Sequence, residues 1–334
     1  MADPIATVVI PNYNGIRHLP TLLESLEAQT DSRFTVTIVD DVSTDDSVAY
    51  LRKQWPQVRL VCNERNIGFA GSCNAGLRSA TTPFVILLNN DTHVDPDWLA
   101  EGLRPFEREE IAAVASLVLL ADPPHLIDTA GDVYSVVGGA QKRNHLHGRE
   151  TIDSLDGDCF SPCGASAFYR RDVIEKLGYL DEGFESYYED VDLGFRLAWA
   201  GYRCAFAPRS ICYHHLSSSY NPRGWRYHYN SARNAEIVWR SHMPPRLRRK
   251  YFFSHLCFLL LQGLNKLRQG CFRPYLAGKW SVRRHRRRIL EKREENRKFA
   301  RIGDDEIESR LVRNWWALHV TSRWTGTHRS GHRT

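Results

Sequence analysis

Two groups of polar residues in this chain could take part in chemistry, and the first follows an apolar run. Residues 84–88 contain no charged side chain and predict a buried strand. Asn89, Asn90 and Asp91 follow at its carboxyl end, where open α/β sheets bind their ligands. Their oxygens are suitable ligands for a hard divalent cation that carries a diphosphate. The alternative is an Asx-rich turn that caps a helix opening near Asp97.

The second group is acidic and lies at the start of an expected helix. Glu189 is explained by the helix dipole, which acids at this end complement. Asp192 can form an ion pair with Arg196, one turn further on. Asp190 has no such helical partner, and it follows a tyrosine pair, ending at Tyr188, that could line a pocket. We therefore assign Asp190 the role of general base.

A histidine pair, His214 and His215, follows an expected strand over residues 204–212. Paired histidines are usually a surface feature, but a neutral imidazole at a strand end can complete a metal sphere or contact a phosphate. Ser217, Ser218 and Ser219 make the next loop polar.

Alternating strands and helices are expected to position these groups. Apolar, β-branched runs predict the strands, and apolar residues at helical spacing predict the helices. The expected strands are 5–10, 34–39, 58–61 and 84–88, and the helices between them contain residues 19–26, 48–55 and 70–80. This order predicts an α/β fold with a parallel, doubly wound sheet.

Polar residues follow each of these strands at one edge of the predicted sheet. They are Asn12, Asn14, Asp40, Asp41, Asn63, Asn66 and the triplet that ends at Asp91. Neither GxGxxG nor GxxxxGK[ST] occurs, which argues against a dinucleotide oxidoreductase or a P-loop NTPase. A sugar-nucleotide site remains, in which Asp41 accepts from the base N3–H and Asp91 anchors the metal of the diphosphate.

Composition indicates a globular protein of the cytoplasm. The 334 residues are 42% hydrophobic and 25% charged, and the formal net charge is +6. Eight cysteines show no CxxC spacing and are expected to be reduced thiols. The first residues, MADPIATVVIP, lack the basic and apolar regions of a signal peptide.

The carboxyl-terminal region is rich in arginine, and we expect residues 241–334 to be basic helices. Its apolar stretch, residues 252–264, is shorter than the ~20 residues that span a bilayer. One interpretation is an amphipathic element on an anionic membrane surface, with Trp280, Trp315 and Trp316 as interfacial aromatics. The other is a helical hairpin packed on the preceding domain. No recognition motif accompanies the arginines, so nucleic acid is not an expected partner.

Seven segments, taken together and in order, resemble family 2 glycosyltransferases. They are TVVIPNYNG, VDDVSTDDS, NIGFAGSCNAGL, LLNNDTHVDPDWL, FYRRDVIEKLGYLDEGF, YYEDVDLGFRLAWAGYR and HHLSSS. The closest likeness is to bacterial rhamnosyltransferases of cell-surface polysaccharide synthesis. The resemblance implies a GT-A-type, Rossmann-like nucleotide-sugar-binding domain over residues 1–240, with the basic helical region after it.

The resemblance also implies roles at the donor side of the site. Pro11, Tyr13 and Asp41 would hold the base and ribose, with Asp40 in support. The full donor-binding assignment is Pro11, Tyr13, Asn14, Asp40, Asp41, Asn66, Gly68, Asn89 and Asn90. Asn90, Asp91 and His214 would hold Mg²⁺ or Mn²⁺. Asn90 stands where many relatives have aspartate, which would weaken metal affinity.

At the acceptor side, Asp190 matches the base of the family's ED motif. Arg233, with the asparagine after it, matches an RN pair that often follows the histidine loop. The residues assigned to the sugar and acceptor are Gly164, Tyr188, Glu189, Asp192 and Arg233.

We therefore expect an inverting glycosyltransferase that transfers L-rhamnose from dTDP-L-rhamnose to a lipid-linked or growing polysaccharide acceptor. It would act at the inner face of a bacterial cell membrane. One alternative is a UDP-hexose or UDP-galactofuranose transferase of the same family. The other is a catalytically silent nucleotide-sugar or glycan-binding domain, which the missing acid at Asn90 would allow, although Asp41, Asp91 and Asp190 favour an enzyme.

Overall fold

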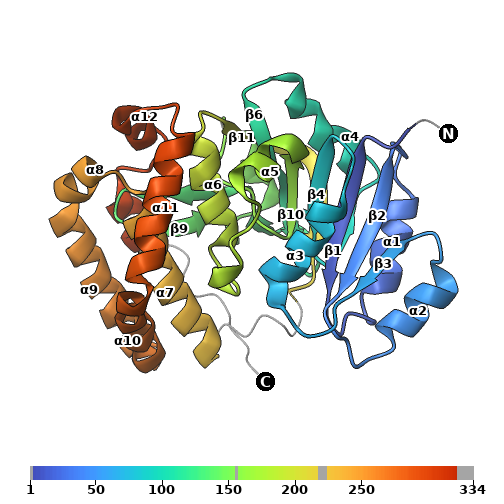
Figure 1. Ribbon diagram of the computed structural model, residues 1–334, viewed down its shortest axis with the longest axis horizontal. Coiled ribbons are helices and arrows are strands. Elements are labelled where there is room, and N and C mark those ends of the chain that lie inside the picture. Colours follow the sequence, from blue (N-terminus) through green and yellow to red (C-terminus); the bar gives the residue numbers. More distant parts are fainter. Residues whose placement is uncertain (1–2, 155–156, 217–223, 322–334) are drawn as a thin grey trace.

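The computed structural model describes residues 3–154, 157–216 and 224–321 (Figure 1). The described residues form a nine-stranded mixed sheet in the order β3-β2-β1-β4-β10-β6-β11-β5, with β7 paired to β6. Four parallel strands make up one half: β1 (Ala6–Asn12), β2 (Phe34–Asp40), β3 (Arg59–Cys62) and β4 (Phe84–Leu88). This half confirms the predicted alternation of strands and helices.

Helices cover both faces of the parallel half, because alternate strand residues point to opposite sides. Val8 and Ile10 of β1 pack in one core with α1 (Leu19–Glu27) and with Leu51 of α2 (Ser47–Gln54). Val9 faces the other core, which includes α3 (Gly68–Ser79). Pro11 lies within β1, opposite Val39 of β2, so the strand runs one residue beyond this proline rather than ending before it.

The other half of the sheet is mixed, which the sequence analysis did not predict. β10 (Ser166–Arg170) runs antiparallel between β4 and the fully buried β6 (Ile111–Leu120). β11 (Arg203–His214) pairs with β6 and with the short β5 (Thr92–Val94). Because β11 extends to His214, this histidine is the last strand residue and not part of the following loop.

Shorter elements complete this half. They are α4 (Trp98–Leu103), β7 (Ile127–Thr129), β8 (Asp132–Tyr134), β9 (Ala140–Lys142), α5 (Arg171–Leu177) and α6 (Glu189–Trp199). β8 and β9 pair as a separate two-stranded sheet. All eight cysteines are free.

The remaining helices gather at one end of the sheet (Figure 1). They are α7 (Trp225–His242), α8 (Pro245–Lys250), α9 (Phe252–Arg268), α10 (Phe272–Ser281), α11 (Arg286–Phe299) and α12 (Asp304–Ser309). All of them except α10 share a hydrophobic core with Tyr134 of β8 and Phe195 of α6, and α10 packs on α7 through Gly278. The expected boundary at residue 240 falls inside α7. Within the described residues, no helix has the length and apolar character needed to cross a bilayer.

Candidate active site

The loops after β1 and β2 are joined by the buried carboxylate of Asp40. It accepts hydrogen bonds from Asn12 Nδ2 at 2.9 Å, from Ser43 Oγ at 2.6 Å and from the Ser43 amide at 2.9 Å. Asn14 shapes the same loop, because its Oδ1 accepts from the Thr44 amide at 2.7 Å. Tyr13 is 49% exposed beside them. Asp40 thus fixes the two loops to each other, and its supporting role in donor binding stays a prediction.

Asp41 lies at the amino end of α3 and is also buried. Its carboxylate accepts from the backbone amides of Ile67 and Gly68 and from Asn63 Nδ2, each at 2.9 Å. Asn66 Nδ2 donates to the Asp41 carbonyl at 3.2 Å. A carboxylate has about four acceptor positions, so one position on Oδ2 is available to a base N3–H.

Asn90 faces Asn12 across the ends of β1 and β4. Asn90 Nδ2 donates to Asn12 Oδ1 at 2.9 Å, while Asn12 Nδ2 is turned toward Asp40 and Ser43. A Cβ on Gly15 would come within about 2.3 Å of both amides, so only glycine fits against this pair. Residue 90 therefore acts as a donor to Asn12, which an ionised aspartate could not do.

His214 brings a buried imidazole to Asp91, because β5 and β11 pair side by side. His214 Nε2 lies 3.3 Å from Asp91 Oδ1, and His214 Nδ1 lies 3.0 Å from Asp128 Oδ2. Asp128 is fully buried and also meets Lys142 Nζ at 2.7 Å. Burial lowers the pKa of His214, but the bonds to Asp128 and Asp91 outweigh it and raise the pKa to about 9.

Asp128 is a site residue that sequence analysis missed. It lies in a strand of only three residues, β7, which has no clear sequence pattern. It holds one ring nitrogen of His214 and so directs the other toward Asp91. A carboxylate behind a metal-binding histidine commonly fixes the orientation of the ring in this way.

The fit to a divalent cation is partial. In the part of the chain that the structure describes, no group of three or more His, Cys, Asp or Glu side chains is arranged to hold a metal ion. Asp91 and His214 can supply two donor atoms, and the Asn90 amide oxygen can supply a third. Such a set suits a cation only if a diphosphate supplies further ligands.

Asp190 is positioned by the backbone at the start of β10. Its Oδ2 accepts from the Gly164 amide at 3.3 Å, and its Oδ1 accepts from the Val191 amide at 2.8 Å. The next residue, Ala165, accepts through its carbonyl from the Asn89 amide at 3.1 Å. Asp190 therefore lies beside the polar triplet that follows β4. Burial raises the pKa of Asp190, although the two amides oppose this shift.

Two further carboxylates lie near Asp190. Burial and the charge of Asp190 raise the pKa of Glu189 and of Asp132. Glu189 Oε2 and Asp132 Oδ1 are buried and have no hydrogen-bond partner among the described residues. Asp132, in β8, was also missed by sequence analysis. Asp190 is thus one of a group of three neighbouring carboxylates.

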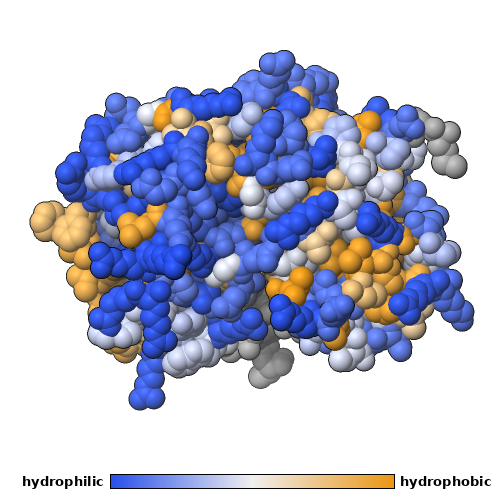
Figure 2. Space-filling model, in the orientation of Figure 1, coloured by the Kyte–Doolittle hydropathy of each residue, from blue (hydrophilic) through white to orange (hydrophobic). Residues whose placement is uncertain are grey.

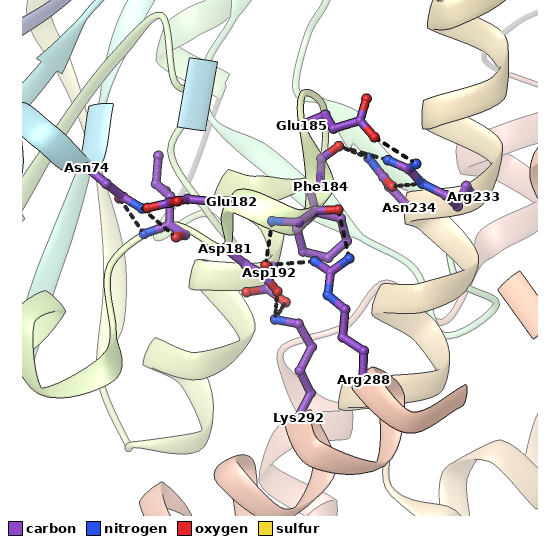
Figure 3. A network of polar contacts seen from close by, with 12 residues as sticks. Asn74, Asp181, Glu182, Phe184, Glu185, Asp192, Arg233, Asn234, Arg288 and Lys292 are labelled. Atoms are coloured by element: carbon purple, nitrogen blue, oxygen red, sulfur yellow. Dashed lines mark hydrogen bonds and ion pairs between the residues drawn. The ribbon is translucent and has the colours of Figure 1, made fainter. Parts of the chain in front are cut away.

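Arg233 and Asn234 of α7 hold the segment that leads into α6 (Figure 3). Arg233 donates to the Phe184 carbonyl at 3.0 Å and to Glu185 Oε1 at 3.1 Å. Asn234 Nδ2 lies within 3.0 Å of the carbonyls of three residues, Phe184, Ser186 and Tyr187. The buried Arg233 is placed to position this segment, and not to touch a sugar directly.

Asp192 is fully buried between helices. Its carboxylate meets Arg196 Nε at 3.0 Å, His242 Nε2 at 2.7 Å and Lys292 Nζ at 2.6 Å. Burial alone would raise its pKa, but Lys292, Arg196 and His242 lower it well below the usual value. The structure therefore favours the ion pair with Arg196 for Asp192, and not contact with the sugar or acceptor.

The polar loop predicted at Ser217, Ser218 and Ser219 lies outside the described residues.

The comparisons with known proteins agree with this geometry. The sequence profile of Glycosyl transferase family 2 matches residues 7–178. The chain is 30% identical over 226 residues to the O-antigen biosynthesis protein RfbC of Myxococcus xanthus, which covers 65% of this chain but only 18% of that protein. It is 27% identical over 244 residues to the N-acetylglucosaminyl-diphospho-decaprenol L-rhamnosyltransferase of Mycobacterium tuberculosis, covering 66% of this chain and 78% of that protein.

Solved structures show the same fold. The mannosyltransferase PcManGT of Pyrobaculum calidifontis, solved with GDP-Man and Mn²⁺, superimposes with a TM-score of 0.53 at 17% identity. The superposition covers 97% of this chain and 84% of that one. The α/β fold is therefore of the GT-A type.

Proposed function

Since the chain belongs to glycosyl transferase family 2, we propose that it transfers L-rhamnose from dTDP-L-rhamnose, with inversion, to a lipid-linked or growing polysaccharide. Two relatives support the sugar and the acceptor: one is named for O-antigen biosynthesis, and the other for L-rhamnosyl transfer to a diphospho-decaprenol. An acceptor of this lipid-linked kind would place the enzyme at the inner face of a bacterial membrane.

The observation that carries the proposal is the meeting of two groups at the strand ends. Asp41 and Asp91 lie at the edge formed by β2 and β4, and Asp190 reaches the same edge through Gly164. A donor bound between Asp41 and Asp91 would present its sugar toward Asp190. The side chains assigned to donor and acceptor would thus face one reaction space.

The chemistry that these residues support is a single displacement. The acceptor oxygen attacks the anomeric carbon as the bond to the diphosphate breaks, and Asp190 takes the proton of the acceptor hydroxyl. Burial raises the pKa of Asp190, which makes its ionised form a stronger base. A divalent cation held by Asp91, Asn90 and His214 would neutralise charge on the departing diphosphate.

The test is calorimetric titration of the full chain with dTDP, UDP and GDP, each with and without Mn²⁺. We expect Mn²⁺-dependent binding of dTDP, abolished in Asp91→Ala. Preference for UDP would replace the rhamnosyl donor with a hexose or galactofuranose donor. Binding of none of the three nucleotides would contradict the proposal and favour a silent domain.

A further inference from the structure

Helix α9 presents a continuous apolar stripe to solvent. Phe253, Leu256, Leu260, Leu264 and Leu267 are between 40% and 78% exposed. Their spacing of three and four residues places them on one face of the helix. At a rise of about 1.5 Å per residue the stripe is about 21 Å long. The opposite face, with His255 and Phe258, packs in the core.

Helix α10 packs on α9 through Tyr275 and also exposes two apolar side chains, Leu276 and Trp280, which are 51% and 65% exposed. Figure 2 shows hydrophobic side chains along the edge of the molecule where Figure 1 places α9. Large exposed apolar surfaces mark sites of association with a protein or a membrane. We name this surface, made by the α9 stripe with Leu276 and Trp280, the α9–α10 face.

The segment that contains the α9–α10 face carries charge of one sign, although Arg246, Lys250 and Lys279 form ion pairs with carboxylates outside it. Residues 237–290 contain 14 lysines and arginines and no aspartate or glutamate. Arg249, Arg268, Arg273 and Arg283 are exposed, and no ion pair to a carboxylate of the described residues is found for any of them. Arg283 lies over the Trp280 ring, 2.9 Å from its centroid. An apolar stripe edged by arginines and an aromatic ring is the composition of a helix that lies in a membrane interface.

We propose that the α9–α10 face docks on an anionic lipid bilayer. The stripe lies in the interfacial region parallel to the membrane plane, and the arginines contact lipid phosphates. A second copy of the chain would fit less well, because a two-fold contact would place like-charged arginines against one another. Nucleic acid would use the arginines and leave the apolar stripe without a partner.

The docking face is rigidly connected to the candidate site. Gly278 of α10 packs against α7 so closely that a Cβ would lie 2.4 Å from the Tyr229 carbonyl oxygen. Four residues later in α7, Arg233 holds the segment that precedes Asp190. Docking through α10 would therefore fix the orientation of the site relative to the bilayer, as a lipid-linked acceptor requires.

The experiment is co-sedimentation of the full chain with large unilamellar vesicles. One set contains equal parts of phosphatidylglycerol and phosphatidylcholine, and the other contains phosphatidylcholine alone. We expect binding to the anionic vesicles, at least tenfold stronger than to the neutral ones and weakened by salt. The double variant L260E/L264E should bind at least tenfold more weakly than wild type. Leu146→Glu, at another leucine that is 54% exposed, is the matched control and should bind as wild type does.

Thermal unfolding checks that L260E/L264E is folded. We expect a melting temperature close to that of wild type, because both leucine side chains are exposed. Equal binding by wild type and L260E/L264E, or no binding of wild type at low salt, would overturn the proposal. Light scattering distinguishes the other possible occupant of the face. If wild type is a dimer, the double variant is a monomer and neither binds vesicles, the α9–α10 face binds a second copy of the chain. No nucleotide sugar is present, so the result is independent of the proposed transfer reaction.

Discussion

At the scale of single residues, the direction of a few hydrogen bonds decides which side chain each position can carry. The amide of Asn12 is oriented by Asp40, which accepts from its Nδ2. Its Oδ1 is therefore presented to residue 90, where Asn90 donates. If the Asn12 side-chain amide were flipped, its Oδ1 would face the Asp40 carboxylate, and two acceptors would lie against each other. The pair thus requires an amide at position 90.

The change Asn90→Asp should destabilise the protein, although it adds a negative charge to the candidate metal site. A carboxylate would face Asn12 Oδ1, and an unpaired acceptor costs about 1 kcal/mol or more. Urea unfolding measures the loss of free energy. Asn314→Asp is a control, because Asn314 Oδ1 already acts as an acceptor, from the Ala317 amide. An Asn90→Asp variant as stable as wild type would show that the Asn12 amide is not fixed.

The change Asp190→Asn should reduce sugar transfer by about 10²-fold or more, because the amide cannot take the acceptor proton. Binding of dTDP, measured by calorimetry, should remain near the wild-type value. The exposed Asp172, on α5, gives the control variant Asp172→Asn. Turnover close to wild type in Asp190→Asn would remove this residue from the role of base.

Asp132 should make stability depend on pH. Burial and Asp190 raise its pKa to about 8, so between pH 4 and pH 8 the folded state binds a proton that the unfolded state has released. Stability contributed by this proton is lost as pH rises through that window. Asp132→Asn cannot titrate, so its stability relative to wild type should improve by up to about 4 kcal/mol between pH 5 and pH 8, at about 1.4 kcal/mol per pH unit.

Urea unfolding at several pH values tests this prediction, with the exposed Asp153→Asn as the control. A difference between Asp132→Asn and wild type that stays constant with pH would mean that Asp132 is ionised throughout.

At the scale of elements, the segment between η3 (Glu182–Phe184) and α6 is a strained connection held from outside. Glu185, Tyr187 and Tyr188 all have positive φ, at 64°, 71° and 74°. A non-glycine residue in this region costs energy, which the surrounding structure must offset. Asn234 offsets it by donating to three carbonyls of this segment. A helix outside the parallel half of the fold therefore sets the position of the candidate base.

The change Asn234→Ala should lower kcat at least tenfold and leave the donor KM nearly unchanged. Releasing the carbonyls lets the segment relax, and a misplaced base slows the chemical step without affecting the nucleotide site. Steady-state kinetics separates the two constants. Asn265→Ala, on α9, is the matched control. A rise in donor KM with unchanged kcat would instead place Asn234 in donor binding.

At the scale of the whole molecule, the basic residues of the carboxyl-terminal helices form two groups. One group makes contacts inside the protein, and the other is exposed to solvent. Arg288 and Lys292 of α11 are used internally (Figure 3). Arg288 donates to the Gly183 carbonyl at 2.7 Å, and Lys292 joins Asp181 and Asp192. Arg249 and Arg283 remain at the surface. The carboxyl-terminal helices thus support the site through one group and offer the α9–α10 face with the other.

A fragment of residues 1–240 should fail to fold on its own. Cutting there divides α7 and removes Leu247, Phe258 and Ile289 from the core that they share with Phe195. Asp192 would keep Arg196 but lose His242 and Lys292. Together with the exposed apolar surface this would cost several kcal/mol, since breaking one buried ion pair costs about 3–5. Calorimetry should show no cooperative transition. A fragment with the melting temperature of the full chain would prove 1–240 to be autonomous.

The sequence by itself determined the parallel half of the fold and the identity of most groups in the candidate site. β-branched runs and helical periodicity are local signals, and polar residues after parallel strands must meet at one edge. Asp41 and Asp91 could be named for this reason. Asp190 was named from its place at the start of a helix, and His214 from the resemblance to family 2 glycosyltransferases.

Only the tertiary structure decided the partners of these groups. Asp128 and Asp132 are distant in sequence from His214 and Asp190, and they reach them through strands that no local pattern marks. The inward position of Asp192 and the outward stripe of α9 depend on which helices pack together. Charge and apolar character are visible in a sequence, but which side of a helix is buried is set by contacts between distant segments.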